Sequence, residues 1–170
     1  VGGGRSNVAE ALYSTAAGGA GDVGGGGYSV VSGGRLNQAG GTDAVVGGGQ
    51  ANVAGGNGAT VGGGWLNEAT GPYAVVPGGV NNAATGYASF AGGQSAEAVH
   101  GGTFVWADQS SANFTSTGDN QFLIRAAGGV GIGLDNPETA LDVDGVIRSR
   151  AGGVQFPDGS TQLTAAFSGW

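Results

Sequence analysis

Apolar, glycine-rich and polar positions recur every 15 residues along the first two thirds of the chain. Seven glycine-rich blocks mark this period, and they begin at Val1, Ala16, Val31, Val46, Val61, Val76 and Ala91. A polar position follows six residues after each start, and it is occupied by Asn7, Asp22, Asn37, Asn52, Asn67, Asn82 and Glu97. The register runs through residues 1–107 without an insertion. A constant period of this kind predicts a solenoid in which each repeat forms one coil.

Each repeat is expected to contain two short strands and two turns. One strand is apolar, as in residues 29–31 (Ser-Val-Val) and 74–76 (Ala-Val-Val), and the other is mixed, as in residues 66–69 (Leu-Asn-Glu-Ala). Glycine in the blocks between them permits the positive φ angles of tight turns at no steric cost. Short strands repeated at a fixed period stack into parallel ladders. The predicted fold class is therefore all-β, with a parallel β-roll over residues 1–107.

Adjacent valines in the apolar strand predict an apolar outer surface as well as an apolar core. Side chains alternate between the two faces of a strand, so one valine of the pair Val30 and Val31 faces the coil interior and the other faces out. The structural candidates in this strand are Val31, Val46, Val61 and Val76. An outward valine on successive coils forms a stripe that is too apolar to remain in water. We expect identical chains to associate along this stripe in a closed ring, which would bury every copy of it.

The asparagine column has two interpretations. In the first it is structural, and each side chain hydrogen-bonds to its neighbour one coil away or caps a turn. The members of this ladder are Asn7, Asn37, Asn52, Asn67 and Asn82. In the second interpretation the column is a row of ligands for sugar or metal. Asparagine alone is a poor metal ligand and no carboxylate accompanies it in each repeat, so the sequence favours the ladder.

Composition narrows the range of functions. Of 170 residues 41 are glycine, and the chain has no Cys, Met or Lys and a formal charge of −7. These absences exclude zinc–thiolate sites, P-loops and Schiff bases, and the charge disfavours nucleic acid and acidic membranes as partners. No apolar run is long enough for a membrane-spanning helix, so no membrane insertion is expected. No catalytic, cofactor-binding or metal-binding residue is assigned. Because the chain starts at Val1 and lacks Met, we expect it to be a piece of a longer protein.

The recurring Val-Gly-Gly-Gly-x-x-Asn-x-Ala-x-Gly pattern resembles the YadA-like head of trimeric autotransporter adhesins, and similar repeats occur in trimeric tail fibres of phages and phage-like injection machines. This resemblance implies a left-handed parallel β-roll in each chain, with three chains packed side by side. It also implies a role in attachment at a cell or particle surface. The sequence departs from the commonest adhesin pattern in its 15-residue unit and in carrying asparagine where serine is frequent.

The last third of the chain differs from the repeats. Phe104 and Trp106 are expected to close the core and to pack in the trimer, with a sugar-stacking surface as the alternative. His100, beside them, is interpreted as a surface or packing residue. Residues 108–120 are predicted to be a linker or neck, and residues 121–170 a β-rich, prism-like trimeric region.

Four elements are predicted in this C-terminal region. Strands are expected over residues 121–126 and 129–133, and hairpins over residues 141–148 and 154–163, with Asp-Gly and Pro-Asp-Gly turns. The motifs of these elements also resemble the segment that follows YadA-like heads in tail-fibre-like proteins. That resemblance implies an interwoven trimeric β-prism or neck.

The sequence therefore predicts a non-enzymatic, homotrimeric fibre or adhesin segment that is extracellular, on a cell surface or on a virion or injection-particle fibre. Its expected partner is a cell-surface glycan or protein receptor, and the candidate receptor-facing residues are Tyr13, Tyr28, Tyr73 and Tyr87. One alternative is a passive spacer that holds other domains apart. A polysaccharide-cleaving β-helix is less favoured, because glycosidases need a pair of carboxylates and the acids of the repeats are scattered.

Overall fold

The computed structural model describes residues 1–110, 112–150, 153–155, 157 and 159–162. The described residues form short β-strands and no helix, so none of them belongs to a helix that could cross a membrane. The chain divides into two compact units, residues 1–127 and residues 128–170. The all-β prediction is confirmed.

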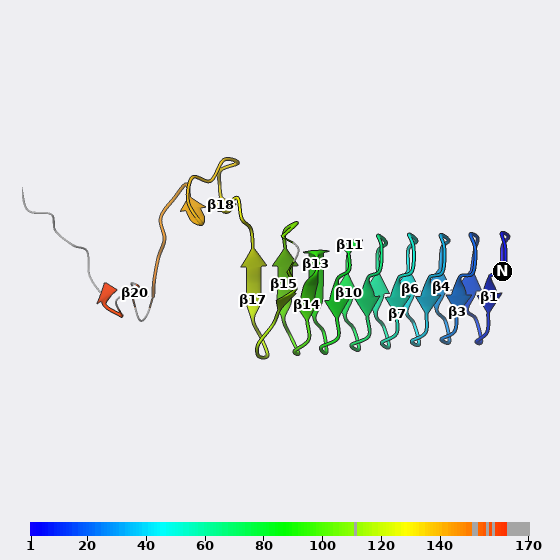
Figure 1. Ribbon diagram of the computed structural model, residues 1–170. Coiled ribbons are helices and arrows are strands. Elements are labelled where there is room, and N and C mark those ends of the chain that lie inside the picture. Colours follow the sequence, from blue (N-terminus) through cyan, green and yellow to red (C-terminus); the bar gives the residue numbers. More distant parts are fainter. Residues whose placement is uncertain (111, 151–152, 156, 158, 163–170) are drawn as a thin grey trace, which may run out of the picture. The chain divides into compact units, whose positions relative to one another are not determined.

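The first unit is a solenoid made of two parallel sheets (Figure 1). The first sheet contains β1 (Val8–Ala9), β3 (Val23–Gly24), β5 (Gln38–Ala39), β7 (Val53–Ala54), β9 (Glu68–Ala69), β12 (Ala83–Ala84), β14 (Ala96–Ala98) and β16 (Phe114–Thr115). The second sheet contains β2 (Thr15–Ala16), β4 (Val30–Val31), β6 (Val45–Val46), β8 (Thr60–Val61), β10 (Val75–Val76), β13 (Phe90–Gln94), β15 (Phe104–Ala107) and β17 (Phe122–Arg125), and β11 (Gly79–Val80) pairs with β13. The chain alternates between the two sheets, so each coil contributes one strand to each.

The strands pair in parallel with the matching strand of the next coil. Val30 is opposite Val45 and Val45 is opposite Thr60, so partners lie 15 positions apart in this part of the chain. The backbone supplies the bonds between coils, as in the 2.9 Å hydrogen bond from the Val45 N–H to the Ala59 carbonyl. The prediction of stacked parallel strands in a β-solenoid is confirmed.

The core of the solenoid is narrow. Its largest apolar side chains are single valines, which are fully buried at Val31, Val46, Val61, Val76 and Val105. The remaining core is mainly alanine, such as Ala54 and Ala69. Because burial stabilises by roughly 25 cal/mol per Å² of apolar surface, such small side chains contribute little per coil. Much of the cohesion must therefore come from hydrogen bonds between coils and from packing on the outside of the roll.

Glycine is required where successive coils approach closely. Gly49 has a φ of +86°, and a Cβ placed on it would overlap the carbonyl oxygen of Gly64 on the next coil. The same steric overlap occurs at Gly56, where an added Cβ would overlap the carbonyl of Gly71 on the next coil. The two glycine columns of the repeat are thus set by the distance between coils as well as by turn conformation.

The solenoid continues beyond residue 107, where the sequence analysis placed its end. β16 pairs with β14, and β17 pairs with β15 over four residues. Residues 108–120, predicted to be a linker or neck, therefore include a strand of the first sheet, and the compact unit extends to residue 127. The spacing between paired residues changes from 15 to 14 and then to 18, as in Phe90–Phe104–Phe122. Backbone pairing tolerates these changes because the extra residues lie in loops.

The second unit contains two small sheets. β18 (Val130–Ile132) pairs in parallel with β19 (Leu141–Val143), and β20 (Val154–Gln155) pairs antiparallel with β21 (Thr161–Gln162). The strands predicted over residues 121–126 and 129–133 and the hairpin over residues 154–163 are confirmed for the described residues. Residues 156, 158 and 163, which belong to that predicted hairpin, lie outside them.

The hairpin predicted over residues 141–148 is wrong. Its first strand, β19, takes β18 as a parallel partner, and the Asp144 N–H extends this pairing with a 2.9 Å hydrogen bond to the Ile132 carbonyl. Val146 and Ile147, expected in the returning strand, are 93% and 67% exposed. The loop through the Asn-Pro turn at 136–137 brings β19 back beside β18, which leaves the Asp-Gly sequence without a hairpin to connect.

Candidate functional site

The outward side chains of the second sheet form a continuous column that we call the outer stripe. Its members are Thr15, Val30, Val45, Thr60, Val75, Phe90, Phe104 and Phe122, each directly opposite the next across the ladder. From Val30 to Phe104 these side chains are half-buried, and Phe122 is 69% exposed. In each adjacent valine pair, the second valine is buried and the first lies in this stripe.

The outer stripe becomes aromatic toward the C-terminal end of the solenoid. The rings of Phe90, Phe104 and Phe122 stack, with 4.5 Å between successive centroids and interplanar angles of 10° and 15°. Two residues further along the same strands, Trp106 and Ile124 also face outward and are 44% and 39% exposed. The apolar surface is therefore widest here.

The outward side chains of the first sheet are different. Their column mixes apolar and polar residues: Val8, Val23, Gln38, Val53, Glu68, Ala83, Glu97 and Thr115. Glu97 bonds to the Thr115 hydroxyl at 2.6 Å and to Asn113. This face can remain in water, whereas the outer stripe is of the kind that soluble proteins cover.

The structure brings the predicted asparagine column together as a buried ladder between the two sheets. Oδ1 of Asn52 accepts a hydrogen bond from the Asn67 N–H at 3.0 Å, and its Nδ2 donates to the carbonyls of Gly48 and Gly64 at 2.9 Å. Each asparagine of the ladder donates in this way to its own pair of glycine carbonyls; these residues are Asn7, Asn37, Asn52, Asn67 and Asn82. Each amide thus joins its own coil to the next, and its polar atoms face the backbone instead of a ligand.

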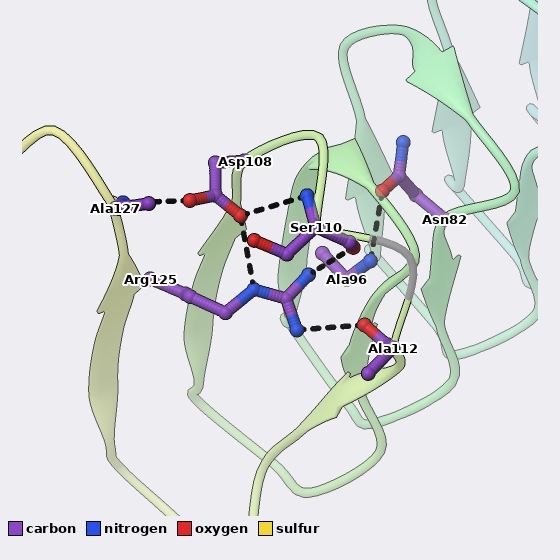
Figure 2. Close-up of polar contacts among 7 residues, drawn as sticks. All are labelled: Asn82, Ala96, Asp108, Ser110, Ala112, Arg125 and Ala127. Atoms are coloured by element: carbon purple, nitrogen blue, oxygen red, sulfur yellow. Dashed lines mark hydrogen bonds and ion pairs between the residues drawn. The ribbon is translucent and has the colours of Figure 1, made fainter.

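The ladder ends one position earlier than the period indicates. Glu97 has the phase of the asparagine column, but the Ala96 N–H is the group that bonds to Asn82 Oδ1, at 3.0 Å (Figure 2). The coil at this point is one residue shorter, so Glu97 moves to the outer face. No signal in the fixed period marks this shift.

The four candidate receptor-facing tyrosines lie exposed at the turns of one edge. Tyr13 and Tyr28 stack with centroids 4.9 Å apart, and Tyr73 and Tyr87 meet edge to face at 5.8 Å. Tyr13, Tyr28 and Tyr73 have φ near +60° and occupy the same turn position in their coils. Asp43 and Gly58 hold this position in the two coils between, so the edge carries two separate aromatic pairs.

An arginine-centred cluster, which sequence analysis missed, joins the last coil to the loop after β15 (Figure 2). Arg125 forms an ion pair with Asp108, Nε to Oδ1 at 3.1 Å, and donates to the carbonyls of Ala112 at 2.6 Å and Ser110 at 3.0 Å. Its guanidinium carbon also lies 5.2 Å from the centre of the Phe114 ring. One side chain therefore fixes the loop, β16 and β17 together.

The carboxylate of Asp108 is the electrostatic centre of this cluster. Hydrogen bonds from the Ser110 side chain, then from the Ala127 and Ser110 backbone N–H groups, and finally from Arg125, hold the pKa of Asp108 well below its ordinary value. Charge-assisted bonds of this kind favour the ionised acid. The contacts are separated by 2 to 19 residues without a period, so no sequence signal announced them.

A hollow of about 280 Å³ lies beside this cluster. Its lining consists of Val80, Gly93, Gln94, Trp106, Ala107, Asp108 and Gln109. The indole of Trp106 also packs over Gly92, whose ideal Cβ position is 3.3 Å from the ring. Trp106 is thus partly a packing residue and partly a wall of an open hollow next to the outer stripe.

The structure also brings His100 to a serine that sequence analysis did not associate with it. His100 Nδ1 lies 2.9 Å from Ser116 Oγ, but that oxygen also accepts the backbone N–H groups of Val99 and His100. Ser116 is only 2% exposed. The hydroxyl is engaged with the backbone and closed to substrate, so we assign the pair a structural role. Within the described residues, no three His, Cys, Asp or Glu side chains converge as metal ligands would.

Comparison with protein-family models gives no match, and comparison with curated proteins gives none either. The class of protein is therefore defined by the fold and its surface: a parallel β-solenoid with one apolar and one polar outer face.

Proposed function

We propose that this chain is a non-enzymatic segment of a homotrimeric fibre or adhesin, with three left-handed rolls of 15-residue coils packed side by side along their outer stripes. The observation that carries this proposal is the contrast between the two outer faces. Valine and phenylalanine dominate one face, while glutamate and glutamine interrupt the other. A single chain would leave the apolar face in water.

The dimensions of the outer stripe suit such an assembly. Neighbouring parallel strands lie about 4.8 Å apart, so the seven steps from Thr15 to Phe122 extend the stripe over roughly 34 Å. A rotationally closed ring covers every copy of one surface and leaves none to recruit further chains. The resemblance to trimeric adhesin heads and tail fibres favours three copies.

The proposed biological role is attachment at the exterior of a cell, virion or injection particle, through a glycan or protein receptor. The two tyrosine pairs support this role, because exposed aromatic side chains are common at binding surfaces. They lie at turns, outside the strands that would form the trimer contact. A passive spacer is the second candidate function. The asparagine ladder is equally suited to a spacer, because its amides bond to the backbone inside the roll.

Oligomeric mass tests the trimer. Light scattering of the 170-residue chain should give three times the chain mass of 16.2 kDa. Val45→Lys should dissociate the assembly, because it places a charge from each chain at the shared contact. Val53→Lys is the matched control: it lies half-buried on the other outer face, beside Glu68, and should leave the trimer intact. A wild-type monomer at micromolar concentration, or equal effects of the two lysines, would overturn the proposal.

Receptor binding separates attachment from spacing. The trimer should bind a component of a glycan array or a cell surface, and Tyr28→Asn with Tyr73→Asn should weaken that binding at least tenfold. Asparagine tolerates the positive φ of both positions. Leu36→Asn, at an exposed positive-φ position on the other turn, is the control. A trimer that binds nothing in these screens supports the spacer instead.

A further inference from the structure

One position of the buried ladder carries a carboxyl group instead of an amide. Asp22 is fully buried, and its Oδ1 accepts hydrogen bonds from the Asn37 N–H at 2.8 Å and from Asn37 Nδ2 at 3.1 Å. Oδ1 of Asn37 makes the same two contacts with Asn52, at 3.0 and 3.1 Å. Asp22 Oδ1 therefore takes the place of an amide oxygen.

Its second oxygen, Oδ2, takes the place of the amide nitrogen. A Cβ added to Gly19 would lie 2.5 Å from Asp22 Oδ2. A Cβ added to the equivalent Gly49 would lie 2.7 Å from Asn52 Nδ2, so the two atoms occupy matching places in their coils. In Asn37 and Asn52 this nitrogen donates to the glycine carbonyls four residues before and twelve residues after, and the equivalent residues for Asp22 are Gly18 and Gly34. Asp22 Oδ2 is buried and has no hydrogen-bond partner among the described residues.

An ionised carboxylate does not fit this position. It can only accept hydrogen bonds, and the groups bound at the equivalent place by Asn37 and Asn52 are glycine carbonyl oxygens, which also only accept. A carboxylic acid fits, because its O–H donates where the amide N–H₂ would. We infer that Asp22 is the neutral acid in the folded chain, with its proton on Oδ2 shared with the carbonyl of Gly18 or Gly34.

The surroundings of Asp22 offer no charge that would substitute for the proton. The side chains that hydrogen-bond to Asp22 from the adjoining coils are the amides of Asn7 and Asn37. Arg5 and Arg35, on the adjoining coils, are exposed, and no ion pair between either of them and Asp22 occurs within the described residues. The ladder position is thus a proton-binding site formed by the fold.

This site makes the stability of the N-terminal coils depend on pH. In the unfolded chain an aspartate is ionised above about pH 4. The folded chain then holds one more proton than the unfolded chain, so stability falls as pH rises. One proton changes the opening equilibrium by roughly tenfold per pH unit. Alkaline conditions would therefore release the first coils of the roll before the rest.

Asp22→Asn is the test, because asparagine is the residue that the rest of the ladder uses. Hydrogen–deuterium exchange of residues 15–40 should be slower in the variant than in wild type. The ratio of the wild-type exchange rate to the variant rate should grow by up to tenfold for each pH unit from pH 5 to pH 8. Comparison at equal pH cancels the intrinsic exchange rate. Asp43→Asn, which removes an exposed acid from the same part of the roll, should leave the wild-type pH dependence unchanged.

Infrared spectroscopy provides a second readout. Wild type at neutral pH should show the carbonyl stretch of a protonated carboxyl group, and Asp22→Asn should lack it. The inference is overturned if that band is absent from wild type, or if Asp22→Asn and wild type share one pH dependence. It is also overturned if added sodium, potassium or calcium stabilises wild type and not the variant, because a cation would then occupy the site.

Discussion

The coils formed by residues 1–89 and those formed by residues 90–127 achieve the same backbone pairing with different side chains. In the first group, which we call the regular coils, a ladder of side-chain amides connects each coil to the next, with Asp22 in place of one amide, and the core is alanine and valine. In the second group, the terminal coils, the amide ladder stops at Ala96, and stacked phenylalanines and the Arg125 cluster take over. A fixed period is therefore needed only where the connecting side chain is short.

The reach of the side chain explains this difference. The amide of Asn52 reaches glycine carbonyls four residues before it and twelve after it, and the amide of Asn82 reaches carbonyls four before and eleven after, so the short side chain tolerates only a small change in coil length. Arg125 instead contacts carbonyls 13 and 15 residues away in an irregular loop. A long side chain with several donors can connect coils of unequal length. The last coils of the solenoid therefore do not need to keep the 15-residue period.

Removing one amide from the regular coils should have the largest effect. Asn52→Ala leaves the Asn67 N–H and the Gly48 carbonyl without their side-chain partner in a buried position, so we expect a loss of about 3 kcal/mol in unfolding free energy. Chemical denaturation measures this loss. Asn57→Ala removes an exposed asparagine that accepts one 3.2 Å bond from the Thr42 N–H, and should cost under about 1 kcal/mol. Equal losses would contradict the role given to the ladder.

Removing one ring from the terminal coils should have a smaller effect confined to that end. Phe104→Ala deletes the middle ring of the stack, and we expect about 2 kcal/mol because the side chain is only half-buried. Hydrogen exchange should accelerate in residues 90–127 and stay unchanged in residues 1–75. Val75→Ala, in the same stripe, should cost about 1 kcal/mol. Faster exchange throughout the roll would show that the two groups of coils are not separable.

The regular coils were predictable from the sequence because each contact repeats with the period. A glycine at position 49, a small core residue and a polar residue at position 52 each recur in phase, so the strands and their parallel stacking could be inferred together. Alternation alone did not decide which valine of a pair faces inward. The structure resolves this point by burying Val46 and leaving Val45 on the outer stripe.

The terminal coils were not predictable, since their contacts follow no period. The strand at 114–115 lies in a polar segment that reads as a linker, and only its pairing with β14 makes it part of the sheet. Arg125 lies in a strand that was expected, yet its partners in the loop carry no motif. The parallel pairing of β18 with β19 likewise depends on a loop path that local turn residues do not specify.

The weakest expected effect is the acid sensitivity of the terminal coils. Its pH dependence is opposite in direction to the one expected at the N-terminal end of the solenoid. The lowered pKa of Asp108 means that its stabilising effect is complete above the ordinary aspartate value of about 4 and is lost as pH falls below it. Hydrogen exchange of residues 104–127 should therefore accelerate, relative to Asp108→Asn at the same pH, as pH is lowered from about 4. The opposite trend is expected at Asp22, where rising pH opens the first coils. Acid opening that is the same in wild type and Asp108→Asn would show that the ion pair with Arg125 contributes nothing to closing the solenoid.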